Sequence, residues 1–312
     1  MRPALLIAVL LVFVSLACGS HEDAESVGEP VSFLTVDTDP DWSPDGRLVA
    51  FASSRRGGGI YVLRPDGTAL RRLFRGVASN VDWSPDGRWI AFEGDHGIYV
   101  IRRAGGRPRR VLRGERFLVP AWAPDGSKLA VVKWERDLAT AIYIVRLDGT
   151  GLRRLLPLRP SKSDPNWEAV AASETEPAWS PDGRQIAFQA GDGQIVAANV
   201  AGGRRRMIAT GASEPAWSPD GRLIAFDFEG AVWVANADGS GDRRLLASNG
   251  RDPSWAPDSG RLVFEVLHWY GRYWRRPQSL SLVDADDGGL QKLTFGNSVA
   301  DDPGWRGDKA TP

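Results

Sequence analysis

The sequence contains one cysteine, Cys18, among its 312 residues, so it cannot form an intramolecular disulfide. It has no excess of charge of either sign, with 39 basic and 39 acidic residues, which argues against binding to nucleic acid or to an anionic membrane surface. Its three histidines lack the spacing of zinc ligands. It also contains no G-x-S-x-G, P-loop or G-x-G-x-x-G motif, so we expect neither catalysis nor a resident cofactor.

Long apolar runs are equally scarce, because the longest, Ala4–Ala17, is too short to span a bilayer as a mature helix. It fits a signal-peptide core, and we assign residues 1–18 to that role. Ser15–Cys18 resembles a bacterial lipobox, which makes Cys18 the candidate lipidation site; a signal cleaved without lipidation is the alternative. Polar residues 19–30 are predicted to form a flexible tether. We therefore expect export to the bacterial envelope, at its periplasmic or extracellular face, with a lipid anchor as the sole membrane contact.

What the sequence does contain is one pentapeptide, Trp-Ser-Pro-Asp-Gly or a close variant, repeated along the chain. The six copies begin at Trp42, Trp83, Trp122, Trp179, Trp217 and Trp255. Their spacings are 41, 39, 57, 38 and 38 residues, and a degenerate copy at Trp305 follows after 50 more. A period near 40 residues is typical of an array of small units that bury their apolar faces against one another.

One repeat contains four short runs of strand character. In the fifth copy Pro215–Trp217 ends at a Pro-Asp-Gly turn, and Leu223–Phe226 follows it. Ala231–Ala235 is the third run, and a second turn precedes the fourth, Arg243–Leu246. Because no run is long enough for an ordinary helix, each repeat is predicted to be a four-stranded antiparallel sheet.

Six such sheets in a ring make an all-β fold, a single β-propeller of six four-stranded blades spanning residues 31–305. Seven blades, with an incomplete one beginning near Trp305, is the alternative, and residues 306–312 are predicted to be a disordered tail. Burial of one Trp contributes about 4–6 kcal/mol at most, so we interpret the repeated Trp as a wedge between sheets. We expect a terminal strand, Phe33–Val36 or Lys292–Phe295, to pair into the sheet of the opposite terminus and close the ring.

The repeat resembles the TolB-like (PD40, WD40-like) propeller repeat, whose pattern P-x-W-S-P-D-G-x-x-I-A-F is matched by Pro215–Phe226. The resemblance extends over residues 35–305. It implies a six- or seven-bladed platform that binds envelope partners at the end of its channel. The same repeat also forms the propeller portions of peptidases, so the resemblance indicates the fold more specifically than the activity.

The position three residues before each repeat Trp is acidic in five of seven copies. In a closed ring these side chains would converge on one mouth of the central channel and favour a cationic ligand, a peptide terminus or a divalent metal. The competing interpretation is that each carboxylate merely caps a loop or accepts backbone N–H bonds. The candidate channel-mouth residues are Asp39, Asn80, Glu176, Glu214, Asp252 and Asp302.

An insertion in the sixth repeat, residues 268–276, holds four aromatic residues and three arginines in nine positions. Aromatic side chains beside arginine are typical of recognition surfaces, and an extended hairpin that folds onto the rim is the alternative. The candidate partner-binding residues are His268, Trp269, Tyr270, Arg272, Tyr273 and Trp274.

Paired arginines in the fourth run of five repeats could suggest nucleic acid, but charge on an outer strand also prevents edge-to-edge aggregation, and we expect no nucleic-acid partner. The sequence thus favours a monomeric, non-catalytic envelope propeller that binds a protein or peptide through its channel face and the blade-six insertion. The alternative is a propeller enzyme, similar to a polysaccharide lyase or hydrolase, that uses channel carboxylates and a divalent cation.

Overall fold

The computed structural model describes residues 35–135, 139–155, 174–191, 193–202, 205–270, 274–286 and 288–294. These residues form 24 strands and one short 3-10 turn, η1 (Arg55–Gly57). None of them belongs to a helix long and apolar enough to cross a membrane. The predicted signal peptide, lipidation site, tether and C-terminal tail lie outside the described residues, as do Asp302 and Trp305, and remain predictions.

The strands form six separate four-stranded antiparallel sheets, which confirms the predicted all-β propeller of six blades. Blade 1 contains β1 (Asp37–Trp42), β2 (Val49–Ser53), β3 (Gly59–Leu63) and β4 (Arg71–Arg75). Blade 2 contains β5 (Ala78–Trp83), β6 (Trp89–Gly94), β7 (Gly97–Arg102) and β8 (Arg109–Arg113). Blade 3 contains β9 (Phe117–Trp122), β10 (Lys128–Trp134), β11 (Thr140–Arg146) and β12 (Arg153–Arg154).

The second half of the ring repeats this arrangement. Blade 4 contains β13 (Glu174–Trp179), β14 (Gln185–Ala190), β15 (Gln194–Asn199) and β16 (Arg205–Thr210). Blade 5 contains β17 (Ala212–Trp217), β18 (Leu223–Phe228), β19 (Ala231–Asn236) and β20 (Arg244–Ala247). Blade 6 contains β21 (Gly250–Trp255), β22 (Arg261–Tyr270), β23 (Trp274–Asp284) and β24 (Leu290–Lys292).

The repeated Ser-Pro-Asp-Gly segment forms the tight turn between the first and second strands of a blade. In blade 1 the Asp45 carboxylate accepts hydrogen bonds from the Ser43 hydroxyl at 2.6 Å and the Arg47 N–H at 3.1 Å. Gly46 adopts a φ of +66°, which a residue with a side chain rarely takes. The turn therefore favours Asp and Gly at these positions, which explains why the motif recurs, although in blade 6 Ser259 takes the glycine position with a φ of +59°.

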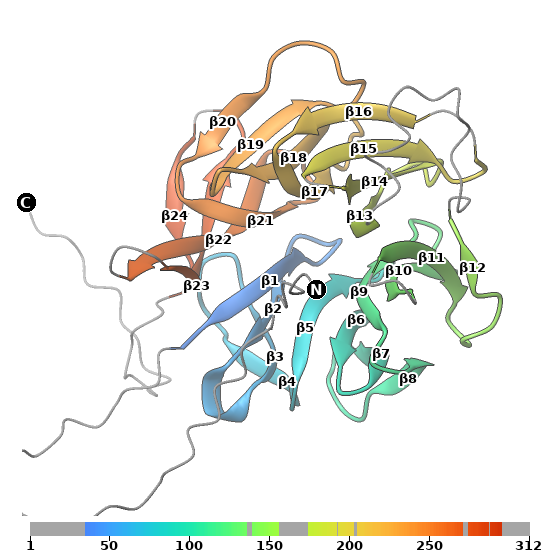
Figure 1. Ribbon diagram of the computed structural model, residues 1–312. Coiled ribbons are helices and arrows are strands. Elements are labelled where there is room, and N and C mark those ends of the chain that lie inside the picture. Colours follow the sequence, from blue (N-terminus) through green and yellow to red (C-terminus); the bar gives the residue numbers. More distant parts are fainter. Residues whose placement is uncertain are drawn as a thin grey trace, which may run out of the picture. The chain divides into compact units, whose positions relative to one another are not determined.

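The six blades form a closed ring, because each pair of neighbours shares its own apolar cluster. The clusters join blades 1 and 2, 2 and 3, 3 and 4, 4 and 5, 5 and 6, and 6 and 1. At the centre, each first strand contacts the first strands of both neighbouring blades (Figure 1). The repeat Trp side chains lie within these clusters and all are buried except Trp217, which is half-buried. Their predicted role as wedges is thus confirmed.

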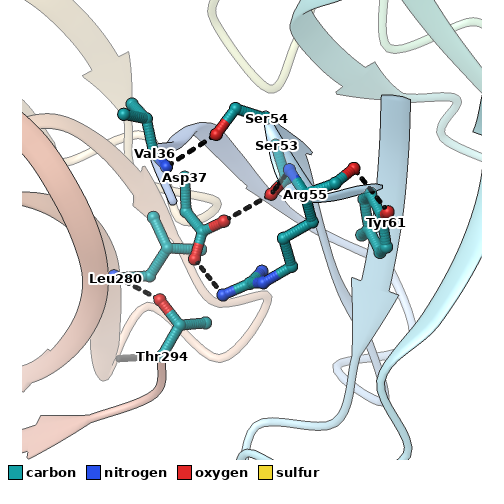
Figure 2. Close-up of polar contacts among 8 residues, drawn as sticks. All are labelled: Val36, Asp37, Ser53, Ser54, Arg55, Tyr61, Leu280 and Thr294. Carbon is teal, nitrogen blue, oxygen red and sulfur yellow. Dashed lines mark hydrogen bonds and ion pairs between the residues drawn. The ribbon is translucent and has the colours of Figure 1, made fainter. Parts of the chain in front are cut away.

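Blade 1 meets blade 6 through side chains, around the buried Asp37 (Figure 2). Asp37 accepts hydrogen bonds from the Ser53 hydroxyl at 2.7 Å and from Arg55 at 2.6 Å. Thr294, which follows the last strand of blade 6, also hydrogen-bonds to this carboxylate. Its hydroxyl accepts the Leu280 N–H at 2.9 Å, which anchors it to β23.

The predicted exchange of a terminal strand between the first and last blades is wrong for the described residues, where every sheet consists of four consecutive strands. The physical reason is that Leu290–Lys292 already occupies the outer edge of blade 6 as β24. Val36 instead continues β1, and its N–H and C=O both bond to Ser54.

Arginines of the outer strands connect neighbouring blades, a role that the sequence did not indicate. Each donates to a backbone carbonyl near the turn between the third and fourth strands of the next blade. The pairs are Arg71 with Arg103 and Ala104, Arg109 with Leu147, Arg206 with Ala237, and Arg244 with Ala285. Gln291 does the same from blade 6 to Pro65 of blade 1.

Candidate functional site: the carboxylates of the central channel

The innermost strand of every blade contains a β-bulge at its third residue. The strand register shifts at this point in all six blades. The bulge residues all have positive φ, between +44° and +54°, and they are Asp39, Asn80, Val119, Glu176, Glu214 and Asp252. Because non-glycine residues rarely adopt this conformation, its sixfold repetition marks a position that the packing of the ring imposes.

These bulges are linked around the ring by carboxylates. Glu176 accepts the backbone N–H of Glu214 at 2.6 Å, and Glu214 accepts that of Asp252 at 2.6 Å. Asp39 of blade 1 likewise accepts the N–H of Asn80. Glu176, Glu214 and Asp39 each connect their blade to the next one, and binding of a ligand by the channel carboxylates stays a prediction.

In blades 2 and 6 the bulge residue does not accept the bulge N–H of the next blade, and a glutamate on the second strand accepts it instead. In blade 6, Glu265 accepts the Asp39 N–H at 2.7 Å. In blade 2, Glu93 accepts the Asn80 side-chain amide at 2.9 Å and the Val119 N–H at 3.4 Å. Together with the three bulge carboxylates, these two connect five of the six blade interfaces.

A second set of acids, half-buried in the structure, lies one residue before the repeat Trp. Asp41 accepts the Trp83 N–H at 2.7 Å and the Ser254 hydroxyl at 2.7 Å. Asp82 accepts the Trp122 N–H at 2.5 Å. Blades 6, 1 and 2 thus line their part of the channel with polar groups at this position, whereas blades 3, 4 and 5 carry alanine there.

Burial and mutual repulsion raise the pKa values of these carboxyl groups. Burial, followed by the charge of Glu176, raises the pKa of Glu214 to about 8. Burial raises the pKa of Glu265 to about 7 and that of Asp41 to about 6. For Asp252, burial and the charges of Glu214 and Glu265 raise the pKa well above its ordinary value. The channel therefore holds more carboxyl groups than its own cations can neutralise.

The densest group of acids comprises Asp39, Asp252 and Glu265, each with one oxygen within 4.8 Å of the others. Arg251 is their nearest cation, and its Nε lies 2.8 Å from Glu265 Oε2. The neighbouring carboxylates raise the pKa of Arg251 although burial would lower it. Among the described residues, none donates a hydrogen bond to the Asp252 carboxylate, which leaves this group able to accept one from a ligand.

The bulges lie toward one side of the ring, which we call the bulge face. On this side each first strand begins and each second strand turns into the third, as the pairs Asp37–Ser53 and Ser53–Gly59 show in blade 1. The opposite side, the turn face, carries the Ser-Pro-Asp-Gly turns. In blade 6 the turn on the bulge face is extended, because β22 and β23 continue their pairing as far as Tyr270 and Trp274.

The structure thus brings five of the six channel-mouth candidates together at the bulge face and places the sixth, Asp302, outside the described residues. Among the partner-binding candidates, His268, Trp269, Tyr270 and Trp274 lie on the paired strands of the hairpin, while Arg272 and Tyr273 fall outside the described residues. The insertion is therefore an extended hairpin, which leaves its suitability for a partner as a separate hypothesis.

Sequence reasoning missed Asp41, Asp82, Glu93, Arg251 and Glu265. A signal was present in the alignment of the repeats, because Asp41 and Asp82 replace the alanine of other copies. Glu93 and Glu265 follow the phenylalanine of the second strand, where blade 1 has Ala52 and blade 3 has Val132.

Comparison with known proteins agrees with this architecture. The family model described as PD40, TolB beta propeller domain, matches residues 23–155 and 114–309. A curated protein, the uncharacterized peptidase YuxL of Bacillus subtilis (strain 168), is 28% identical over 178 residues. That match includes 49% of this chain but only 22% of the length of YuxL.

Two solved structures share the fold. TolB from Acinetobacter baumannii superposes with a TM-score of 0.60 at 17% identity, over 82% of this chain and 62% of TolB. Oligogalacturonate lyase from Vibrio parahaemolyticus superposes with a TM-score of 0.55 at 15% identity, over 85% of this chain and 80% of the lyase. At these identities the likeness establishes the fold and not the activity.

Proposed function

Because the chain belongs to the TolB β-propeller (PD40) family, we propose that it is a non-catalytic binding platform of the bacterial cell envelope. It recognises a protein or peptide partner at the bulge face, through the channel carboxylates and the extended hairpin of blade 6. In this proposal the chain is exported, and lipidation at Cys18 anchors it to the membrane.

The observation that carries this proposal is the cluster of Asp39, Asp252 and Glu265. Three carboxyl groups with oxygens within 4.8 Å of one another have Arg251 as their nearest cation, so ionisation of the whole cluster is unfavourable without a further positive charge. A lysine or arginine side chain, or the terminal amine of a peptide, would relieve this repulsion. Such a group fits better than an anionic or apolar ligand, because it would also restore the ordinary ionised state of the acids.

The hairpin adds a second area of contact on the same face. β22 and β23 are 10 and 11 residues long, whereas their equivalents in blade 1 have five residues each. Of the five and six additional residues, one in each strand lies at the turn face, and the other four or five, at about 3.3 Å each, extend the hairpin by roughly 15 Å on the bulge face. A partner that inserts a cationic group into the channel would be within reach of this arm.

Capture of partners from envelope extracts tests the proposal. Asp252→Asn removes a carboxyl group that a bound cation would ionise, without removing an acceptor of a backbone N–H. Trp269→Ala with Trp274→Ala alters the hairpin. Asp242→Asn, at an exposed acid of the turn face, is the matched control. We expect the channel and hairpin variants to lose the captured partner and the control to retain it.

Retention of the same partner by both the channel and the hairpin variants would exclude the bulge face as the binding surface. Mass spectrometry of the captured proteins provides the readout, and the thermal unfolding profile of each variant verifies that its ring is intact.

The same three carboxylates support a second candidate, a metal-assisted lyase or hydrolase of acidic polysaccharide. Carboxylate oxygens suit Ca²⁺, Mg²⁺ or Mn²⁺, and an oligogalacturonate lyase shares the fold. However, both oxygens of Glu265 are engaged, one by the Asp39 N–H and the other by Arg251, so a metal would have to displace this arginine. Incubation with polygalacturonate and each cation, followed by ultraviolet detection of unsaturated products, tests this candidate; no product with any cation excludes lyase activity.

A further inference from the structure

A groove of about 750 Å³ opens on the turn face of blade 2, away from the channel carboxylates. It lies between the turn that joins β5 to β6 and the turn that follows β7. Its charged and aromatic lining residues are Arg71, Asp86, Arg88, Trp89, Arg102 and Arg103. Four arginines against one aspartate make it a strongly basic region of a chain whose charges otherwise balance.

The arginines of this groove divide into two that are anchored and two that are available. Arg103 lies 2.7 Å from Asp45 of blade 1, and Arg71 donates to the carbonyl of Arg103 at 3.1 Å. Arg88 approaches Asp86 only to 4.0 Å, with 81% of its side chain exposed. Arg102 is exposed and stacks on the Trp89 ring, 5.2 Å from the ring centre. Arg88 and Arg102 therefore retain N–H donors for an incoming acid.

The one acid in the lining, Asp86, offsets only part of their positive charge. Asp86 accepts hydrogen bonds from the Ser84 hydroxyl at 2.6 Å and from the Arg88 N–H at 3.0 Å. These bonds hold its carboxylate in the turn, and the Ser84 bond is the first cause of its lowered pKa. Asp86 therefore stays ionised, and four arginines against this one carboxylate leave the lining with an excess of three positive charges.

The groove is a departure from the repeat, because no other blade combines these residues. The position of Trp89 is occupied in the other blades by Leu48, Lys128, Gln185, Leu223 and Arg261. The position of Arg103 is occupied elsewhere by proline, leucine, valine or alanine. Both residues also take part in the packing of the ring, Trp89 against the apolar cluster between blades 2 and 3 and Arg103 in its pair with Asp45, but no other blade needs this combination.

We propose that this groove binds an acidic peptide segment of a partner protein, as a second site distinct from the bulge face. Arg88 and Arg102 pair with carboxylates of the peptide, since guanidinium groups form strong, planar hydrogen bonds with them. Trp89 packs against an apolar side chain between those carboxylates. A volume of about 750 Å³ accommodates a ligand of this kind.

Fluorescence anisotropy with a labelled peptide of alternating Glu and Leu tests the site on the whole protein. Arg88→Glu combined with Arg102→Glu should weaken binding by about tenfold or more, because it reverses two charges in the contact. Trp89→Leu, which installs the residue of blades 1 and 5, should weaken binding without disturbing the fold. Binding should also weaken as salt is added.

The chain provides a matched control in blade 5. Arg222 occupies the same turn position as Arg88, lies 3.9 Å from Asp220 and has 85% of its side chain exposed. Arg222→Glu should leave the affinity for the peptide within about twofold, as expected for a charge outside the contact. Asp252→Asn should also leave it unchanged, so that failure of this site can be distinguished from failure of the proposed channel function.

Two results would overturn the proposal. One is an affinity that the double charge reversal in blade 2 changes no more than Arg222→Glu does. The other is competition in which trigalacturonate displaces the peptide at equal or lower concentration, because the groove would then be a site for acidic saccharide.

Discussion

The Oε2 atom of Glu214 lies 2.6 Å from the backbone nitrogen of Asp252, in the neighbouring blade. This bond joins the bulges of blades 5 and 6 and places two carboxyl groups close together. Their proximity lets a group that stabilises the ring also contribute to its negative channel. Stability and ligand binding are thus expected to respond to the same protonation events.

The first prediction is that the protein becomes less stable as the pH rises. Burial and the charge of Glu176 raise the pKa of Glu214 from 4.5 to about 8 in the folded state. The folded protein therefore binds more protons than the unfolded chain between these values. This stabilisation is complete below the unfolded pKa and is lost as the pH rises through the folded one. We expect the melting temperature to fall by a few degrees between about pH 5 and about pH 8.

Glu214→Gln is the matched variant, because an amide oxygen can still accept the Asp252 N–H but cannot ionise. Its melting temperature should depend less on pH and should exceed that of the wild type at about pH 8. A wild-type melting temperature that increases over this range, measured by circular dichroism, would contradict the assigned direction.

The second prediction concerns Val119, the only β-branched residue among the six bulges. Its φ of +44° places a branched side chain in a conformation that such residues rarely adopt. Val119→Asn installs the residue that blade 2 carries at Asn80, and it should stabilise the fold by about 1 kcal/mol. Urea unfolding measures the change; a destabilised variant would mean that packing of the Val119 side chain outweighs the backbone strain.

The third prediction concerns the contact between the first and last blades. Arg55 pairs with Asp37, whose side chain is fully buried. Arg55→Met leaves that carboxylate without its cation and should cost about 3 kcal/mol. Adding Asp37→Asn to Arg55→Met should restore part of the loss, because no buried charge then remains. Chemical denaturation should show the double variant to be more stable than Arg55→Met alone. Equal stabilities would contradict the assigned cause, an unpaired buried charge at Asp37.

The fourth prediction distinguishes the arginines that connect blades from those that only cover an edge. Arg206 donates to the Ala237 carbonyl of the next blade at 2.7 Å, in a half-buried position. Arg206→Ala should therefore lower the free energy of unfolding by about 1 kcal/mol. Arg110→Ala removes an exposed arginine of the equivalent pair in blade 2, and its effect should stay within about 0.5 kcal/mol. Similar losses in both variants would contradict the role of Arg206.

The repeat unit could be predicted from sequence because its turns have strict chemical requirements. Asp45 must accept hydrogen bonds within the turn and Gly46 must adopt a positive φ. The turn therefore has a recognisable sequence, and each copy of it indicates where a blade begins. The alternation of these turns with apolar runs then determines four strands per unit. The count of six blades follows from the copies themselves.

The links between carboxylates and bulges could not be predicted in the same way. The bulge position accepts Asp, Asn, Glu or Val, so no residue type reveals its positive φ. The partners of these groups lie on other blades, at sequence separations such as 226 residues between Asp39 and Glu265. Spacing from the repeat Trp identified the position, but only the packed ring shows which amide each acid meets.

Closure of the ring through side chains has a consequence for how the protein would unfold and aggregate. At the junction of blades 1 and 6 no peptide connection joins the two sheets, and among the described residues no strand of one pairs with the other. Heat or denaturant can separate blade 1 from blade 6 while each sheet keeps its own backbone hydrogen bonds. The surfaces thus uncovered, which include Trp42, Phe51 and Leu280, are each complementary to the other. Two opened molecules could therefore join end to end, and loss of closure is where assembly into unwanted oligomers would begin.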